Sequence, residues 1–350
     1  MRGPRDADQP WKEAGAARFV DPRLQALSWA VLAPNPHNMQ PWLIDLADED
    51  RIDIYFQTDR GLPQTDPWDR QLTIGFGAFT ELLVMGAAHA GYQAEVSPFP
   101  DGAPQPKLDG RRIVSIRLRA EQAQADPLFS AVLRRRTDRG NYALEPLGQD
   151  VGGAIAAELR NPAGFDLHDD EADVVALRDL AIRAFEIEMR TPLTWMESID
   201  VMRIGRAEMD AEPWGLALRG PMIEFGRLVG AVSRESLADP AGAGFQTGLD
   251  MFNTAIASTP AFVSQVTPGN SRLDQFETGR DWLRLHLAAT RLGLTLQPCS
   301  QALQEYAEQA EPYAEIHERL APSGGTVQMF ARIGRANAFR RRRAGRSKLG

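Results

Sequence analysis

Cysteine is almost absent from this sequence. Cys299 is the single one, so an intrachain disulfide or a metal site built from several cysteines is excluded. Unpaired thiols are typical of a reducing compartment, and we expect the chain to be cytoplasmic. Cys299 follows a proline at the end of an expected strand, where an inert thiol is the favoured interpretation.

Long apolar runs and targeting signals are also missing. We find no run that we expect to span a bilayer. The first residues carry Arg2 and Arg5 without an apolar run behind them, which argues against a secretory signal or an anchor. The sequence therefore predicts no membrane partner.

Familiar catalytic signatures are absent as well. No Gly-x-Ser-x-Gly elbow is present, and no glycine-rich turn follows a strand as a dinucleotide site requires. No histidine has the spacing of a metal ligand pair, so we expect no metal. His89 and His286 fall in apolar helices and are interpreted as packing residues. If the chain is an enzyme, a cofactor is expected to carry its chemistry. The five histidines are His37, His89, His168, His286 and His317.

What is present describes a globular protein of ordinary composition. The 350 residues are 43% hydrophobic and 25% charged, enough for one large domain or two ordinary ones. A net charge of −8 argues against a nucleic-acid partner. Residues 340–348 form a basic exception, for which a solvated tail is favoured over a nucleic-acid patch.

The order of elements mixes helices with strands. An Asp-Pro pair at 126–127 predicts a further helix start, like the pair at 21–22. Residues 191–244 read as an inserted segment of short helices. Apolar periodicity predicts helices over 22–33, 69–90, 150–160, 171–190, 248–258, 273–292 and 313–320, and strands over 43–46, 52–56, 113–118, 261–266, 294–297 and 326–333, with another strand ending at Val96.

A weak internal repeat divides the chain. Residues 77–91 and 279–293 each run from glycine to glycine through an apolar helix, and a strand follows each. Helices that end in glycine are common, so chance similarity is an equal alternative. The first half carries an Asn/Gln/Pro stretch and the second half an arginine cluster, so two related halves would each supply one side of a site.

The Asn/Gln/Pro stretch is Ala33-Pro34-Asn35-Pro36-His37-Asn38-Met39-Gln40-Pro41-Trp42. Its prolines lack N–H groups and extend the residues before them, which excludes a helix here. The amide side chains are left to bind something else.

The arginine cluster is Arg134-Arg135-Arg136-Thr137-Asp138-Arg139. Guanidinium groups beside a hydroxyl suit a phosphate, which accepts paired hydrogen bonds from arginine. Taken alone, a solvated basic turn is the favoured alternative.

Together these stretches resemble the flavin-dependent nitroreductase family. Residues 34–42 resemble its Pro-Ser-x-x-Asn-x-Gln-Pro-Trp segment, and residues 135–139 its Arg-Arg-Ser-x-Arg phosphate segment. Ordinary members carry the arginine segment first. Here the order is reversed and the two segments lie in different halves, which resembles the Acg-like branch, where one chain is a fused pseudo-dimer with one flavin site.

The resemblance implies an α+β, nitroreductase-like fold. It implies an N-terminal extension (1–20), a first half (21–125), a second half (126–339) with a lid-like insertion (191–244), and a basic tail (340–350). Asn35 and Pro36 replace the serines usual in the family, so the Asn35 amide would replace a hydroxyl contact. Thr137 replaces a serine and keeps its hydroxyl.

The implied function is an FMN-dependent oxidoreductase that passes hydride from NAD(P)H to a nitro, quinone or similar acceptor. No dedicated catalytic side chain is expected, and the chain would be a monomer or a homodimer. A lid-closed FMN-storage protein and a flavin-free interaction protein remain alternatives. The implied FMN-binding residues are Asn35, Asn38, Gln40, Arg135, Arg136, Thr137, Arg139, Arg340 and Arg342.

Overall fold

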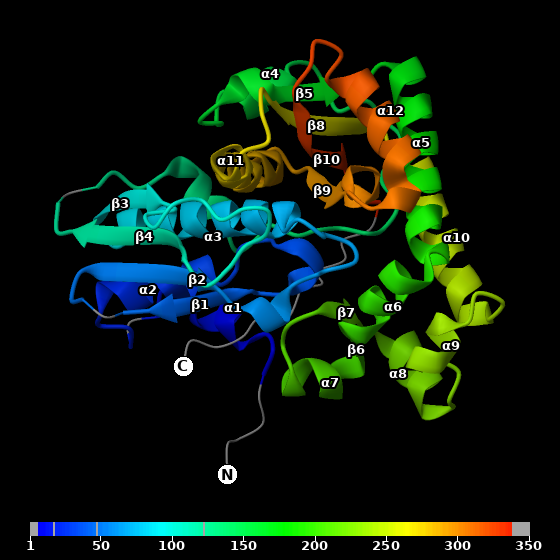
Figure 1. The fold of residues 1–350 in the computed structure, drawn as a ribbon, viewed down its shortest axis with the longest axis horizontal. Helices are drawn as coiled ribbons and strands as arrows, with labels where there is room; N and C mark the ends of the chain where they lie inside the picture. The colour runs from blue at the N-terminus through cyan, green and yellow to red at the C-terminus, as the bar shows by residue number, and fades with distance from the viewer. Residues whose placement is uncertain (1–5, 17, 47, 122, 338–350) are drawn as a thin grey trace.

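The computed structural model describes residues 6–337 except 17, 47 and 122. Two long helices, α3 (Arg70–His89) and α11 (Arg272–Arg291), cross at its centre, with one four-stranded sheet on either side (Figure 1). The predicted α+β fold class is confirmed.

The first half contains one sheet and α3. Asp21 caps α2 by accepting a hydrogen bond from the Arg23 N–H, as the Asp-Pro start predicts. The expected hairpin is present as β1 and β2. The sheet has the strand order β1-β2-β4-β3, with every neighbouring pair antiparallel. Its elements are α1 (Gln9–Glu13), α2 (Pro22–Ala30), β1 (Trp42–Asp45), β2 (Arg51–Phe56), α3, β3 (Gln93–Pro98) and β4 (Arg112–Arg119).

The second half contains the other sheet and α11. The prediction of a helix after Asp126 is wrong, because only a 3₁₀ turn forms over Pro127–Ala131 before the backbone becomes extended. Strand β5 was not expected from the sequence. The elements are α4 (Val151–Ala156), β5 (Phe165–His168), α5 (Glu171–Arg190), α10 (Ala243–Ala257), β8 (Ala261–Thr267), α11, β9 (Thr295–Pro298), α12 (Ala310–Leu320) and β10 (Thr326–Gly334).

The two sheets share one topology. The second sheet has the order β5-β8-β10-β9, which becomes that of the first when β5, β8, β9 and β10 are matched with β1, β2, β3 and β4. Each long helix lies between the second and third strands of its half. Asn161-Pro162 opens a 3₁₀ turn before β5, as Asn35-Pro36 does before β1. The second half therefore carries a short counterpart of the Asn/Gln/Pro stretch that sequence inspection missed.

The inserted segment forms a group of short elements that extends from one end of α5, at the lower right of Figure 1. It includes a parallel strand pair, which the sequence did not reveal. Helix α10 begins at Ala243, inside the predicted insertion and earlier than expected. The elements are α6 (Pro192–Asp200), β6 (Met202–Ile204), α7 (Gly205–Ala211), β7 (Leu216–Leu218), α8 (Pro221–Leu228) and α9 (Arg234–Ala238).

The N-terminal extension packs against the body of the protein. Trp11 of α1 is buried and belongs to the main apolar core. Arg206 of the insertion binds Asp6 and Asp8, each at 2.8 Å. The extension thus connects the insertion to the first half.

By length and composition alone, helix α3 could cross a membrane. This is contrary to our expectation that no apolar run in the sequence is long enough to do so. Most of the helix is buried inside the protein, which is the environment of a core helix.

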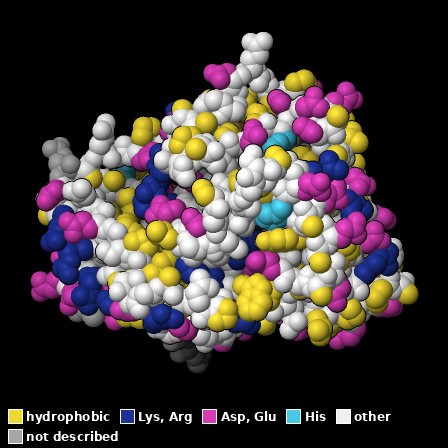
Figure 2. Space-filling model, turned by 45° about the horizontal axis from the view of Figure 1, so that its top comes forward, with side chains coloured by type: hydrophobic (Ala, Val, Ile, Leu, Met, Phe, Trp, Pro, Cys, Tyr) yellow, Lys and Arg dark blue, Asp and Glu magenta, His cyan; other side chains and the backbone are white. Residues whose placement is uncertain are grey.

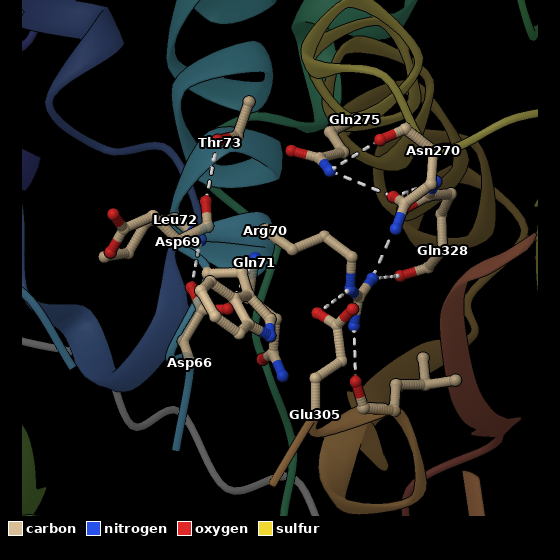
Figure 3. Close-up of polar contacts among 12 residues, drawn as sticks. Asp66, Asp69, Arg70, Gln71, Leu72, Thr73, Asn270, Gln275, Glu305 and Gln328 are labelled. Carbon is tan, nitrogen blue, oxygen red and sulfur yellow. Dashed lines mark hydrogen bonds and ion pairs between the residues drawn. The ribbon is translucent and has the colours of Figure 1, made fainter. Parts of the chain in front are cut away.

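Arg70 at the start of α3 is also buried and donates to the carbonyl oxygens of Gln328 (2.8 Å) and Leu303 (2.7 Å) (Figure 3). Its Nε lies 3.2 Å from a carboxylate oxygen of Glu305. These bonds fix the first half against the second.

Acidic and basic side chains are interspersed over the face shown in Figure 2. Surface ion pairs of this kind contribute little individually. The basic residues expected in the tail lie outside the described residues.

Candidate functional site

The Asn/Gln/Pro stretch folds as a tight, irregular loop between α2 and β1. The expectation that it contains no helix is wrong in part, because Pro36–Asn38 form one 3₁₀ turn. Pro36 takes the first position, where its missing N–H costs nothing. His37, Asn38 and Gln40 have φ of 44°, 56° and 49°. Such left-handed residues are uncommon outside glycine and concentrate at functional sites, which makes this loop a candidate.

Asn35 stabilises the loop from within. Its Oδ1 accepts a hydrogen bond of 2.8 Å from the Gln40 N–H, and its Nδ2 donates to the Ala33 carbonyl at 3.2 Å. The side chain also lies against Gly75 of α3, where an added Cβ would be 3.2 Å from the Asn35 Cβ. Asn35 therefore closes the loop and seats it on the central helix.

Arg135 joins the arginine cluster to this loop. The side chain is buried, and its Nη2 donates to the Leu32 carbonyl at 3.2 Å, just before the loop begins. Its Nη1 lies 3.5 Å from Nδ1 of His286 on α11. His286 Nε2 lies 2.8 Å from the Arg136 carbonyl oxygen, so this histidine supports the cluster as well as packing in the core. Burial, and then the Arg135 charge, lower the His286 pKa well below its usual value.

Arg136 and Thr137 are partly exposed and also contact other parts of the protein. The Arg136 guanidinium lies 5.2 Å from the ring centroid of Trp11 and donates to the Leu133 carbonyl at 2.9 Å. Thr137 forms a parallel β-bridge with Leu296 of β9. These contacts fix the course of the cluster along the edge of the second sheet.

Arg139 differs from its neighbours. Its side chain is solvent-accessible, yet burial, and then the Arg332 charge, lower its pKa. Within the part of the chain that the structure describes, the side chain has no hydrogen bond or ion pair. An exposed cation without an anionic partner among these residues is a candidate anion-binding group.

His37 brings the loop and the cluster together. Burial, and then the positive charge of Arg139, lower the His37 pKa to about 4, so the imidazole is neutral at neutral pH. Its Nδ1 is buried and finds no hydrogen-bond partner among the described residues. Two stretches about a hundred residues apart in sequence thus meet as an uncharged imidazole and an exposed guanidinium.

The insertion covers the other side of the loop. Asn38 Nδ2 donates to the Gly215 carbonyl at 3.2 Å, and the Gly215 N–H donates to the Asn38 carbonyl at 2.9 Å. Gln40 Nε2 donates to the Pro213 carbonyl at 2.7 Å. Trp214, between them, packs with Met39 in a small apolar cluster. The predicted amides of Asn38 and Gln40 are therefore engaged with the insertion.

Two further groups fix the insertion in this position. The Trp214 ring has the guanidinium of Arg60 at 4.6 Å from one of its ring centroids and that of Arg203 at 4.0 Å. Glu197 of α6 accepts hydrogen bonds from the N–H groups of Gln64 (2.8 Å) and Thr65 (3.0 Å). Glu197 was not singled out from the sequence, since its partners lie far away along the chain. Trp214 was expected either to lie on the flavin ring or to pack within the insertion, and it packs with Met39 of the loop.

The structure thus divides the predicted site residues into groups. Arg139 is exposed, Arg135 and Arg136 donate to protein carbonyls, and Asn38 and Gln40 donate to carbonyls of the insertion. Arg340 and Arg342 lie outside the described residues. Across residues 6–337, apart from the three gaps, no cluster of metal-ligating side chains is found.

Comparison with known proteins gives relatives in one functional class. The chain is 27% identical over 346 residues to the Mycobacterium tuberculosis H37Rv protein named "Putative NAD(P)H nitroreductase Rv3131", covering 95% of this chain and 89% of that protein. It is 32% identical over 153 residues to "Putative NAD(P)H nitroreductase acg" of the same strain, 40% of each chain. No protein-family model matches. The predicted relationship to nitroreductases is confirmed.

Among solved structures, a crystal structure described as a "putative nitroreductase" from Anabaena variabilis ATCC 29413 aligns with 96% of this chain and 90% of its own, at 11% identity and a TM-score of 0.43. A nitroreductase-like family protein from Bacillus cereus aligns with 65% of this chain and 93% of its own, at 12% identity and a TM-score of 0.31.

Proposed function

We propose that this chain, which is related over nearly its whole length to proteins named as NAD(P)H nitroreductases, is an FMN-dependent oxidoreductase of the nitroreductase type. FMN, when bound, supplies a ring that takes up hydride from NAD(P)H and passes electrons to a nitro, quinone or similar acceptor. The protein binds and orients the reactants and excludes water.

The observation that carries the proposal is Arg139 beside His37. Arg139 is an exposed guanidinium without an anionic partner among the described residues, and the neighbouring neutral His37 adds no second charge. A phosphate monoester carries up to two negative charges and binds arginine through paired, charge-assisted hydrogen bonds. We assign Arg139 to the FMN phosphate.

The other predicted residues then take supporting roles. Arg135, through the Leu32 carbonyl and His286, keeps the cluster against the Asn/Gln/Pro loop. Asn35 fixes the loop from within. This arrangement agrees with a site shared by two halves, which the common strand order of the two sheets also supports.

The experiment is to purify the protein, add FMN to any colourless fraction, and record its visible spectrum before and after anaerobic NADH or NADPH. We expect a flavin spectrum that bleaches, followed by steady-state reduction of a nitroaromatic or a quinone. A colourless protein that fails to retain FMN would contradict the proposal.

A second candidate function is FMN storage with little turnover. The observation that favours it is the insertion, whose Pro213 and Gly215 carbonyls accept hydrogen bonds from Gln40 and Asn38. An insertion in this position obstructs access to the loop. Bound flavin that stays oxidised in excess NADPH would select this function over reductase turnover.

A further inference from the structure

We propose that Arg332 of β10 is a positioning residue for the anion site, which it shapes by holding the backbone on both sides of Arg139. The inference rests on the proposed FMN function, and it assigns a role to Arg332, a buried residue bonded to the backbone on either side of Arg139. Three features support it: the hydrogen bonds of Arg332, its uncompensated charge and its place in the sheet.

Arg332 is hydrogen-bonded to two backbone carbonyl groups on either side of Arg139. Its Nη2 donates to the carbonyl oxygen of Asp138 at 3.2 Å and to that of Gly140 at 2.8 Å. These are the residues immediately before and after Arg139. Fixing both carbonyls restricts the backbone from which the Arg139 side chain projects.

The remaining contacts make Arg332 itself rigid. It is fully buried, its Nε donates to Gln297 Oε1 at 2.7 Å, and its Nη1 donates to the Ala255 carbonyl at 2.7 Å. The guanidinium also lies 3.9 Å from the ring centroid of Tyr142. A planar guanidinium that is bonded from several sides at once loses its rotational freedom, so its position in the protein is fixed.

None of these partners is a carboxylate. A buried cation is normally paired with an anion, because an unpaired one is costly to desolvate. Arg332 is instead bound by carbonyl and amide oxygens and a ring, and its charge acts on the neighbouring Arg139. The two guanidiniums together would favour a dianionic phosphate more strongly than either alone.

The position of Arg332 in the sheet also holds its backbone in place. Arg332 lies on β10, which is hydrogen-bonded to β8 on one side and to β9 on the other. Gln297, its side-chain partner, is also opposite it in the β9 register. The anion site is thus tied to an interior strand of the second sheet.

The test compares FMN with riboflavin, which has the same ring but no phosphate, by fluorescence titration of the flavin-free protein. Arg332→Lys keeps the charge but cannot span both carbonyls, and Gln297→Glu keeps the hydrogen bond but neutralises the charge. We expect each variant to bind FMN about tenfold more weakly while riboflavin binding changes less than about twofold.

Arg70→Lys is the matched control, since Arg70 is an equally buried arginine that also binds backbone carbonyls but lies at the start of α3. It should leave the preference for FMN over riboflavin unchanged. If Arg332→Lys fails to fold, Gln297→Glu decides the question.

The outcomes separate the inference from the proposed function. A wild-type protein that binds neither flavin contradicts the proposed function and the inference with it. A wild-type preference for FMN that survives in both variants overturns only the role of Arg332. Equal weakening of FMN and riboflavin would assign Arg332 to general stability and would also overturn the inference.

Discussion

Gly77 of α3 and Gly279 of α11 are in contact where the two helices cross. A Cβ on Gly77 would lie 1.9 Å from the Phe276 carbonyl oxygen, and a Cβ on Gly279 would lie 1.9 Å from that of Ile74. Ile74 precedes Gly77 by the same three residues as Phe276 precedes Gly279. The contact of Gly77 with α11 is therefore equivalent to the contact of Gly279 with α3, as at a twofold interface between identical subunits.

Substituting either glycine with alanine should destabilise the protein. Alanine favours a helix by up to about 1 kcal/mol over glycine, but a Cβ contact of 1.9 Å with backbone atoms can be relieved only if the two helices move apart. We expect Gly77→Ala to lower the free energy of unfolding by about 3 kcal/mol in denaturant titrations. Gly110→Ala is the control, because its Cβ would meet nothing within 4 Å. Equal stability of the two variants would disprove the tight crossing.

Replacing Arg139 with alanine should weaken FMN binding by about 10- to 100-fold, because a charge-assisted hydrogen bond to phosphate is lost. The fold should be preserved, since no described residue depends on this side chain for a hydrogen bond. Arg134→Ala is the matched control, from an exposed arginine of the same cluster. Titration of the flavin-free variants with FMN measures the effect, and equal affinities of the two variants would remove Arg139 from the phosphate site.

Weakening the Glu197 contact should loosen the insertion. Glu197→Gln leaves one oxygen where two now accept the N–H groups of Gln64 and Thr65. A hydrogen bond to a charged group contributes about 1.5–3 kcal/mol. We therefore expect the population of molecules in which the insertion has separated from the Gln64 and Thr65 backbone to increase roughly tenfold. The Gly215 amide, which donates to Asn38, should exchange its hydrogen correspondingly faster by NMR or mass spectrometry.

The control for this prediction is Glu235→Gln, an exposed residue of α9 within the insertion. Its Gly215 exchange rate should equal that of the wild type. If Glu197→Gln also leaves that rate unchanged, Glu197 does not hold the insertion in place.

Stability should depend on pH through Glu188. Burial raises the pKa of this carboxyl to about 7, against hydrogen bonds that include one of 2.8 Å from Gln304. The folded state therefore holds a proton that the unfolded state releases near its ordinary pKa, so stability falls as pH rises from about 4.5 to 7. Glu188→Gln, which cannot ionise, should gain about 2 kcal/mol relative to wild type between pH 5 and pH 8.

Denaturant titrations at both pH values measure this difference. Glu318→Gln, on the exposed side of α12, should show no such change. Asp66, whose pKa burial raises to about 6, remains in every variant and cancels from the comparison. A constant difference between wild type and Glu188→Gln across the range would contradict ionisation of a buried Glu188.

Local signals explain which parts of the fold were predictable. The Asp21 cap, the hairpin of β1 and β2, and both central helices follow from proline, turn residues and apolar periodicity, which act over a few neighbouring residues. The helix expected after Asp126 fails because its sequence soon leaves the helical path to bridge Leu296 of β9. Tertiary pairing overrides local preference there.

The sequence by itself determined that two particular stretches matter, because prolines and amides in one and arginines in the other are unusual wherever they occur. Only the tertiary structure decided which of their residues are bound to other parts of the protein. Arg135, Arg136 and Arg139 are chemically the same, yet two of them donate to carbonyls and the third is exposed near His37. Hydrogen-bond partners depend on distance in space, and those of this site come from the residue Leu32 after α2, from α11 and from the insertion.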